Sequence, residues 1–254
     1  MEFFDSHSHY NDEKYDGDRD NIIKNIYEEG ITKTVCVGYN TAKSEVALQI
    51  ANNYPHIFAS CGISPNDIED YSEENLKKIE ILAKSEKIVA IGEIGLDYYW
   101  NKENKEKQKE LFIKQIEIAN RLEKPIIIHT RDAVMDTIEI LKKHPVKQKG
   151  IFHCCPLNPE LIKEAVKLGF YISFSGNVTF KNAKPEGAVL AVPNEKILIE
   201  TDCPYLTPEP FRGHRNDSLK VKIVAEKLAK IKNMSLEEIA KLTNENAEKV
   251  FKMK

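Results

Sequence analysis

The segment Ile126-Ile127-Ile128-His129-Thr130-Arg131 joins an uninterrupted apolar run to a polar end. The segment Ile197-Leu198-Ile199-Glu200-Thr201-Asp202 has the same form. Apolar runs without polar alternation are typical of parallel strands that are buried on both faces. Similar segments recur along the chain, and we predict eight strands, at residues 2–8, 33–39, 56–62, 87–93, 125–130, 149–154, 169–175 and 195–201.

Helical segments separate most of these strands. In one of them, Leu111, Gln115, Ile118, Ala119 and Leu122 recur at helical spacing and mark one face. The 254 residues match the length of one α/β barrel. The pattern therefore predicts a single-domain (β/α)8 TIM barrel over residues 1–254, although an open doubly wound sheet would show the same alternation. The predicted helices are 18–29, 41–53, 72–84, 103–122, 132–143, 157–168 and 218–231.

A last helix is predicted at about residues 235–252. It opens with Ser235-Leu236-Glu237-Glu238, which has the form of a capping box. Its apolar face is expected to pack against the barrel through Ile239, Leu242, Val250 and Phe251.

The composition limits the class of protein. A net charge of −3 with 41% hydrophobic residues predicts a folded domain and argues against a general nucleic-acid coat protein. The five cysteines show no paired framework and are expected to be reduced thiols. No apolar run approaches the ~20 residues of a membrane span, and Met1 to Asp5 lacks the pattern of a secretory signal. We expect a cytoplasmic protein with no membrane partner and no obligate protein partner.

Polar side chains with metal-binding chemistry follow the first and fourth predicted strands. His7 and His9 point the same way, because successive side chains of a strand alternate. By the same rule, Val89, Ile91 and Glu93 are expected to share a face, which places a carboxylate above an apolar stack. An unpaired buried carboxylate is costly, so Glu93 needs a partner.

His129, His153 and Asp202 follow three further strands. In a barrel these strand ends converge on one face. Each histidine alone could be a hydrogen-bonded core residue, and His-x-His alone could be a chance surface pair. Together the imidazoles and carboxylates suit zinc, manganese or a similar ion and exceed the needs of one tetrahedral site. We therefore predict two divalent metal ions, held by His7, His9, Glu93, His129, His153 and Asp202.

Arginine is scarce, since lysine outnumbers it 32 to 5. Nevertheless, Arg131, Arg212 and Arg215 lie in loops that follow predicted metal ligands. Arginine binds phosphate through two parallel hydrogen bonds, so these positions favour an anionic, phosphate-bearing substrate. The alternative for each is an ordinary surface arginine.

Two loops near the predicted ligands have a distinctive composition. Tyr98-Tyr99-Trp100 either stacks a nucleobase or caps the mouth of the barrel. The proline-rich loop 204–210 is expected to fix Asp202 on one side and to aim Arg212 and Arg215 on the other.

Three more carboxylates are candidates for orienting histidines or water. Asp5 shares the face of His7 and His9 by alternation, Glu200 shares that of Asp202, and Asp97 follows Glu93 in the segment 92–98. Ordinary hydrogen bonding within the barrel is the alternative for all three.

Six segments occur in an order and at a spacing that match one known family. They are Asp5-Ser6-His7-Ser8-His9, Gly92-Glu93-Ile94-Gly95-Leu96-Asp97-Tyr98, His129-Thr130-Arg131-Asp132-Ala133, Tyr171-Ile172-Ser173-Phe174-Ser175-Gly176, Glu200-Thr201-Asp202-Cys203-Pro204-Tyr205-Leu206 and Phe211-Arg212-Gly213-His214-Arg215-Asn216. Over essentially the whole chain they resemble the TatD family of metal-dependent deoxyribonucleases, within the amidohydrolase superfamily.

The resemblance implies a barrel with two divalent ions. The four histidines favour zinc or manganese, whereas the family often works with magnesium. The resemblance implies two ligand sets that share Glu93: His7, His9, Glu93 and Asp202 for one ion, and Glu93, His129 and His153 for the other. It also implies hydrolysis of DNA phosphodiester bonds, typically from a 3′ end, so that the implied partner is single-stranded DNA or a DNA 3′ end. We expect Asp202 and Glu93 to be catalytic, with Asp202 accepting the proton of the attacking water and Arg131 stabilising the charge.

The chain departs from the family pattern in two segments. His153-Cys154-Cys155-Pro156-Leu157 stands where the family usually has His-Cys-Phe-Ser-Gly, and Gly62-Ile63-Ser64-Pro65-Asn66 stands where it often has Gly-x-His-Pro-His. Both changes are expected to alter substrate binding, and they leave the predicted metal ligands intact. The expected substrate contacts are Arg131, Arg212, Arg215, Tyr98 and Ser64.

Two other functions are compatible with the same metal ligands. One is a small-molecule amidohydrolase or lactonase, since one fold supports many reactions. The other is a metal-dependent DNA-binding protein without catalysis, which the intact ligand set disfavours.

Overall fold

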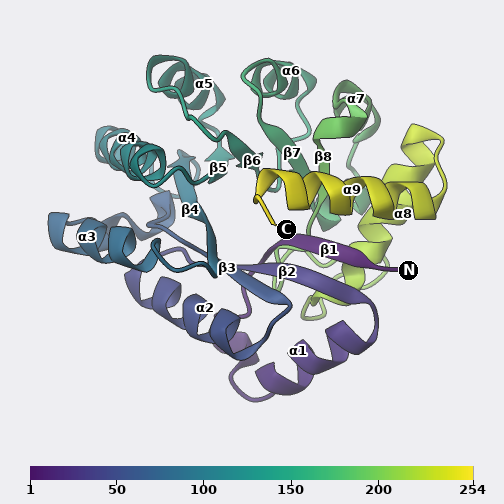
Figure 1. Cartoon of the computed structure of the whole chain (residues 1–254). Helices are drawn as coiled ribbons and strands as arrows, with labels where there is room; N and C mark the ends of the chain where they lie inside the picture. The colour runs from purple at the N-terminus through teal and green to yellow at the C-terminus, as the bar shows by residue number, and fades with distance from the viewer. Residues whose placement is uncertain (254) are drawn as a thin grey trace.

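The computed structural model describes residues 1–253 and contains eight parallel strands in one sheet (Figure 1). The sheet order follows the chain order, and an isolated bridge between Ser8 and Cys203 brings the segment after the last strand beside the first. This nearly closed ring confirms the (β/α)8 barrel and excludes the open doubly wound sheet. The strands are β1 (Phe3–Ser8), β2 (Ile31–Val37), β3 (Ile57–Cys61), β4 (Ile88–Asp97), β5 (Ile126–Arg131), β6 (Gly150–Phe152), β7 (Tyr171–Phe174) and β8 (Ile197–Ile199).

Helices surround the strands, as Figure 1 shows. They are α1 (Arg19–Glu28), α2 (Thr41–Asn53), α3 (Glu73–Leu82), α4 (Lys105–Arg121), α5 (Val134–Lys143), α6 (Pro159–Lys167), α7 (Glu186–Ala191), α8 (Val221–Lys232) and α9 (Leu236–Val250). Helix α7 was not predicted, because this short helix buries only Ala188 and Val189 and so has little periodicity. The segment predicted at 218–231 begins with a 3-10 turn at Ser218–Lys220 before α8.

The alternation predicted for β4 is wrong. Val89 packs with the residues that fill the barrel, whereas Ile91 packs in the cluster beneath the helices. The register of β4 shifts relative to both β3 and β5, which breaks the simple two-residue period. The strand also continues past Glu93 to Asp97, so the carboxylates of Glu93 and Asp97 both come from β4.

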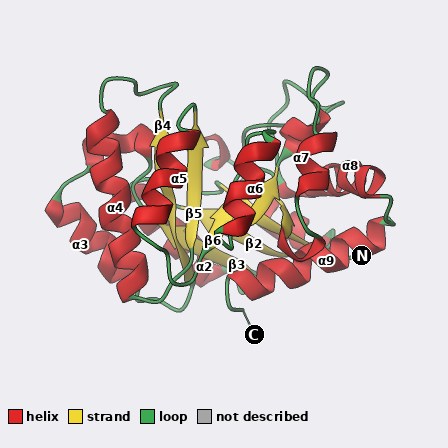
Figure 2. Cartoon of the chain, turned by 90° about the horizontal axis from the view of Figure 1, so that it is seen from above, coloured by secondary structure: helices red, strands yellow, loops and turns green. Residues whose placement is uncertain are grey.

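Helix α9 closes one end of the barrel. The capping box is present, because Ser235 and Glu238 exchange side-chain and backbone hydrogen bonds. Val250 and Phe251 pack against the barrel filling, with the rings of Phe4 and Phe251 6.0 Å apart. Figure 2 shows α9 at the end of the barrel opposite the loops that follow β4 and β5. Polar side chains at the carboxyl ends of the strands therefore lie at the end that α9 leaves open.

Among residues 1–253, no helix combines the length and the apolar character that crossing a bilayer requires. All five cysteines are free thiols.

Candidate metal centre

His7 and His9 bring two imidazole nitrogens together at the end of β1. Both rings are buried, and the two Nε2 atoms lie 3.0 Å apart. The Nδ1 of His9 donates a hydrogen bond to the carbonyl oxygen of Val37 at 3.0 Å, which leaves a lone pair on its Nε2. Burial lowers the pKa of His7 well below its ordinary value, and the neighbouring histidines lower it further. Burial also lowers the pKa of His9, but the carboxylates of Asp202 and Glu93 outweigh it and raise that pKa above its ordinary value, so a cation bound here would take the place of a proton on His9.

Asp202 faces this histidine pair from the segment after β8. Its Oδ1 lies 3.5 Å from Nε2 of His7 and 3.3 Å from Nε2 of His9. Its backbone N–H donates to the carbonyl oxygen of His7 at 2.9 Å, which fixes the segment beside β1. Asp202 adopts a left-handed φ of 55°, a conformation that is uncommon outside glycine and concentrated at functional sites.

Glu93 lies between two pairs of imidazoles. Its Oε1 is 2.9 Å from Nδ1 of His129 and 3.3 Å from Nε2 of His153. Its Oε2 is 3.7 Å from Nε2 of His7 and 3.8 Å from Nε2 of His9. Burial opposes ionisation of Glu93, but His153 and His129 outweigh it and hold its pKa well below the usual range. Each carboxylate oxygen thus faces one pair, as a bridging ligand requires.

His129 is oriented by Asp97. The Nε2–H of His129 donates a hydrogen bond to Oδ2 of Asp97 at 2.9 Å. This contact directs Nδ1 of His129 toward Glu93. The Oδ1 of Asp97 accepts hydrogen bonds from the backbone N–H groups of Tyr99 and Trp100, each at 2.9 Å. Carboxylates placed behind metal-binding histidines in this way fix the ring orientation.

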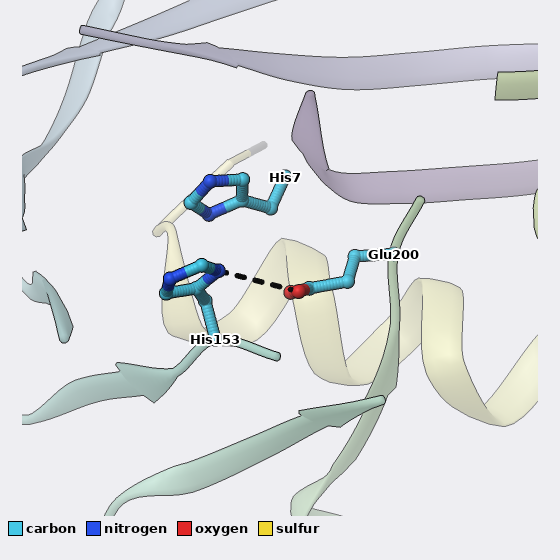
Figure 3. Close-up of side chains that lie close together, drawn as sticks. All are labelled: His7, His153 and Glu200. Carbon is cyan, nitrogen blue, oxygen red and sulfur yellow. Dashed lines mark ion pairs between the residues drawn. The ribbon is translucent and has the colours of Figure 1, made fainter. Parts of the chain in front are cut away.

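His153 is enclosed by His7 and Glu200. Its ring stacks on that of His7 with centroids 3.9 Å apart, and its Nδ1 lies 3.4 Å from Oε1 of Glu200 (Figure 3). The same oxygen accepts a hydrogen bond from the backbone N–H of Cys154 at 2.6 Å. Burial raises the pKa of Glu200, and the His153 contact opposes that rise.

Asp5 contacts no imidazole nitrogen. Its oxygens accept hydrogen bonds from the hydroxyls of Thr201 at 2.5 Å and Ser218 at 2.6 Å, and from the backbone N–H of His7 at 3.3 Å. Burial raises its pKa to about 7, against these hydrogen bonds. Asp5 therefore ties β1 to the segment after β8 and acts on His7 only through the backbone.

The donor set fits metal binding. Ligand atoms of His7, His9 and Glu93 lie within 4.8 Å of one another, as do those of Glu93, His129 and His153. A third group, His7, His153 and Glu200, meets the same distance condition, but Glu200 is fully buried and its Oε1 already accepts a hydrogen bond from the backbone N–H of Cys154. Two facing Nε2 lone pairs at 3.0 Å repel each other unless a cation or a proton lies between them. We therefore assign the first two groups, which share Glu93, as the candidate metal centre.

An open cleft of about 700 Å³ leads to this centre. Arg131 and Ser64, both predicted substrate contacts, line it together with Trp100. Tyr39, Asp67 and Asn177 line the same cleft and were not predicted from the sequence. Asp67 and Asn177 directly follow the segments 62–66 and 171–176 of the family comparison but stand outside them, and Tyr39 has no motif beside it. Only the folded barrel shows that all three reach the cleft.

Three predicted substrate contacts do not line the cleft. The hydroxyl of Tyr98 donates to Asp136 at 2.7 Å. Arg212 donates to the carbonyl oxygen of Thr207, and Arg215 forms an ion pair with Asp18. The loop 204–210 therefore does not aim these two arginines into the cleft, and of the three predicted arginines only Arg131 lines it.

Comparison with known proteins gives the family. A family model described as TatD related DNase matches residues 4–252. The chain belongs to the TatD-related DNase family. The metal-dependent hydrolase YabD of Bacillus subtilis, named as uncharacterized, is 46% identical over 252 residues, covering 98% of this chain and 99% of YabD. YcfH of Escherichia coli K12, named in the same way, is 37% identical over 257 residues, covering 99% of this chain and 96% of YcfH.

Solved structures agree with this membership. The TatD homologue YjjV from Escherichia coli superposes with a TM-score of 0.94 at 25% identity, covering 99% of this chain and 98% of that one. A lactonase from Listeria monocytogenes shares the fold alone, with a TM-score of 0.70 at 18% identity. The match covers 100% of this chain and 95% of the lactonase. The protein is a metal-dependent hydrolase of the TatD family with histidine and glutamate groups that can bind metal.

Proposed function

We propose that this hydrolase is a deoxyribonuclease that removes nucleotides from the 3′ end of single-stranded DNA. The guanidinium of Arg131 carries the proposal. It lines the cleft and stacks 3.8 Å from the centroid of the Tyr99 ring, yet it makes no hydrogen bond or ion pair within residues 1–253. The other four arginines each bond to a carboxylate or carbonyl oxygen. A free guanidinium at a hydrolytic site is suited to bind a phosphate through two hydrogen bonds.

Trp100 supports a single-stranded substrate. Its side chain is 67% exposed and lies beside Arg131, with the guanidinium 5.4 Å from its ring. Exposed aromatic rings next to a cation are typical platforms for unpaired bases. Trp100 thus takes the stacking role that the sequence analysis left open for the whole Tyr98-Tyr99-Trp100 segment.

The reaction replaces one phosphorus–oxygen bond by another. Water oxygen attacks phosphorus, the bond to the 3′ oxygen of the remaining strand breaks, and that oxygen takes a proton. Divalent ions held by His7, His9, Glu93 and Asp202, and by Glu93, His129 and His153, would lower the pKa of water and stabilise phosphate charge.

The protein groups supply orientation and proton transfer. Asp202 is the ligand carboxylate with the more exposed side chain, at 14% against 8% for Glu93, so it is placed to accept the proton of the attacking water. Arg131 binds the non-bridging oxygens of the phosphate and offsets the charge that develops there. Asp97 keeps the ring of His129 in one orientation.

The test uses metal-stripped protein and single-stranded DNA labelled at either end, with Mg²⁺, Mn²⁺ or Zn²⁺ restored. We expect metal-dependent shortening from the 3′ end that Glu93→Gln abolishes and that the distant surface variant Glu164→Gln retains. Absence of DNA cleavage with every ion, together with hydrolysis of lactones or cyclic amides, would replace this proposal with the small-molecule amidohydrolase.

We also propose that the protein works in the cytoplasm. Its five free thiols, four of them buried, fit a reducing compartment. Fractionation of the source cells, followed by immunodetection, tests this location.

A further inference from the structure

Asp67 is a charged group of the cleft that the metal centre does not use. It lies in the 3-10 segment η2 (Pro65–Asp70) after β3. Its Oδ1 accepts a hydrogen bond from the side-chain amide of Asn40 at 2.8 Å. Within residues 1–253 the carboxylate makes no other hydrogen bond and no ion pair. Its Oδ2 is therefore available to accept a hydrogen bond from a bound molecule.

The segment that carries Asp67 is fixed relative to the metal centre. The hydroxyl of Ser64 accepts a hydrogen bond from the backbone N–H of Asn66 at 3.2 Å and caps the segment. The side-chain amide of Asn66 donates to Oδ2 of Asp97 at 3.3 Å, and the same oxygen accepts from His129. A continuous hydrogen-bonded path thus joins the Asp67 segment to a candidate metal ligand.

The charges around the cleft are unevenly placed. Of the three carboxylates that line it, Glu93 and Asp202 belong to the metal centre, which leaves Asp67 as the one without a metal role. Burial raises the pKa of Asp67, and the charges of Glu93 and Asp70 add to that rise. Arg131, the cation of the cleft, comes instead from the end of β5. Arg131 therefore favours a phosphate on its side of the cleft, whereas the Asp67 carboxylate disfavours a phosphate in direct contact with it and can accept a hydrogen bond from a hydroxyl.

We propose that Asp67 selects DNA strands that end in a free 3′-hydroxyl. This inference rests on the proposed function, in which the scissile phosphate binds beside Arg131 and the terminal nucleoside occupies the rest of the cleft. The carboxylate of Asp67 accepts a hydrogen bond from the terminal hydroxyl, and its charge repels a terminal phosphate. Asp67 is thus a specificity-determining residue for the terminal nucleotide that the reaction releases.

The test compares two single-stranded oligodeoxynucleotides of one sequence with a fluorescent 5′ label. One ends in a 3′-hydroxyl and the other in a 3′-phosphate. The kcat/KM for each is measured with Mn²⁺ for the wild type, Asp67→Asn and Glu69→Gln. Glu69 is the matched control, because it is an exposed carboxylate of the same segment that does not line the cleft. Equilibrium binding of both strands to Glu93→Gln, with and without Asp67→Asn, gives a readout that does not depend on turnover.

We expect the wild type and Glu69→Gln to prefer the 3′-hydroxyl strand by at least about tenfold, which corresponds to ~1.4 kcal/mol. Asp67→Asn should reduce the preference to within about threefold, mainly by improving cleavage and binding of the 3′-phosphate strand, because the amide keeps an acceptor and loses the charge. Equal cleavage of both strands by the wild type, or an unchanged preference in Asp67→Asn, overturns the role of Asp67 while the nuclease proposal stands. Failure to cleave either strand with any ion overturns both.

Discussion

The Oδ2 of Asp97 lies 2.9 Å from Nε2 of His129, and both residues stand at the ends of neighbouring strands, β4 and β5. Their strands are paired so that Asp97 is in register with Arg131, two residues beyond His129. The Asp97 carboxylate is fully buried, and it also accepts hydrogen bonds from backbone N–H groups of the loop that carries Trp100. One side chain therefore orients a candidate metal ligand and shapes the cleft wall.

Replacing Asp97 by Asn should weaken metal binding by about 10- to 100-fold, the usual effect of removing a carboxylate behind a metal-binding histidine. Titration calorimetry with Mn²⁺ or Zn²⁺ measures the change. Glu103→Gln is the matched control, because Glu103 is an exposed carboxylate of the following loop. Equal affinity in Asp97→Asn and the control would show that Asp97 supports only the loop.

Replacing Arg131 by Ala should raise the KM for single-stranded DNA by about 10- to 100-fold, because hydrogen bonds to charged groups contribute ~1.5–3 kcal/mol. Arg131→Lys should recover only part of the loss, since lysine lacks the planar pair of donors. Steady-state kinetics give both values. Arg121→Ala is the control, because Arg121 pairs with Glu80 on the helical surface. A wild-type KM in Arg131→Ala would remove the observation on which the phosphate assignment rests.

Metal binding should raise the thermal stability of the protein. An ion at 100 times its Kd stabilises the folded state by ~2.7 kcal/mol, which corresponds to a rise in Tm of about 5–10 °C at this chain length. Thermal unfolding of stripped protein with added Mn²⁺ or Zn²⁺ measures the shift. Glu93→Gln should lose most of it, because Glu93 contributes to both ligand groups. An equal shift in this variant would place the bound ion elsewhere on the protein.

The sequence predicted the barrel because apolar runs and helical periodicity are local properties of the chain. It also predicted which strand ends carry His7, Glu93 and His129, since side chains at the carboxyl ends of barrel strands must converge. The details of β4 were not predictable in this way. The bulged register around Glu93 depends on pairing with β3 and β5, which a two-residue period does not contain.

Substrate contacts were less predictable than metal ligands, because they come from irregular loops. Arg131 and Arg215 have the same chemistry in the sequence, but only the structure shows that Arg215 pairs with Asp18, whereas the Arg131 guanidinium forms no ion pair within residues 1–253. Asp67 was not singled out although Ser64, three residues earlier, was a predicted substrate contact, because only the path of η2 shows that Asp67 also lines the cleft. Long-range packing decides these positions.

His56, which lies away from the metal centre, should make stability depend on pH. It is 8% exposed, its ring stacks 4.5 Å from that of Tyr27, and its buried Nε2 has no hydrogen-bond partner within residues 1–253. Burial lowers its pKa below the ordinary 6.5, and Lys87 lowers it further. Below pH 6.5 the unfolded chain therefore binds a proton that the folded protein does not, so the His56 contribution to stability is complete above pH 6.5 and is lost as the pH falls toward the folded-state pKa.

Urea unfolding between pH 5 and 8 tests whether the free energy of unfolding falls as the pH falls. Relative to His56→Gln, the wild type should lose up to ~1.4 kcal/mol of unfolding free energy per pH unit below 6.5. His214→Gln removes an exposed histidine and should follow the wild type at every pH. If the wild type and His56→Gln gave parallel curves, the folded protein would accommodate the imidazolium, and the buried Nε2 would have to find an acceptor on protonation.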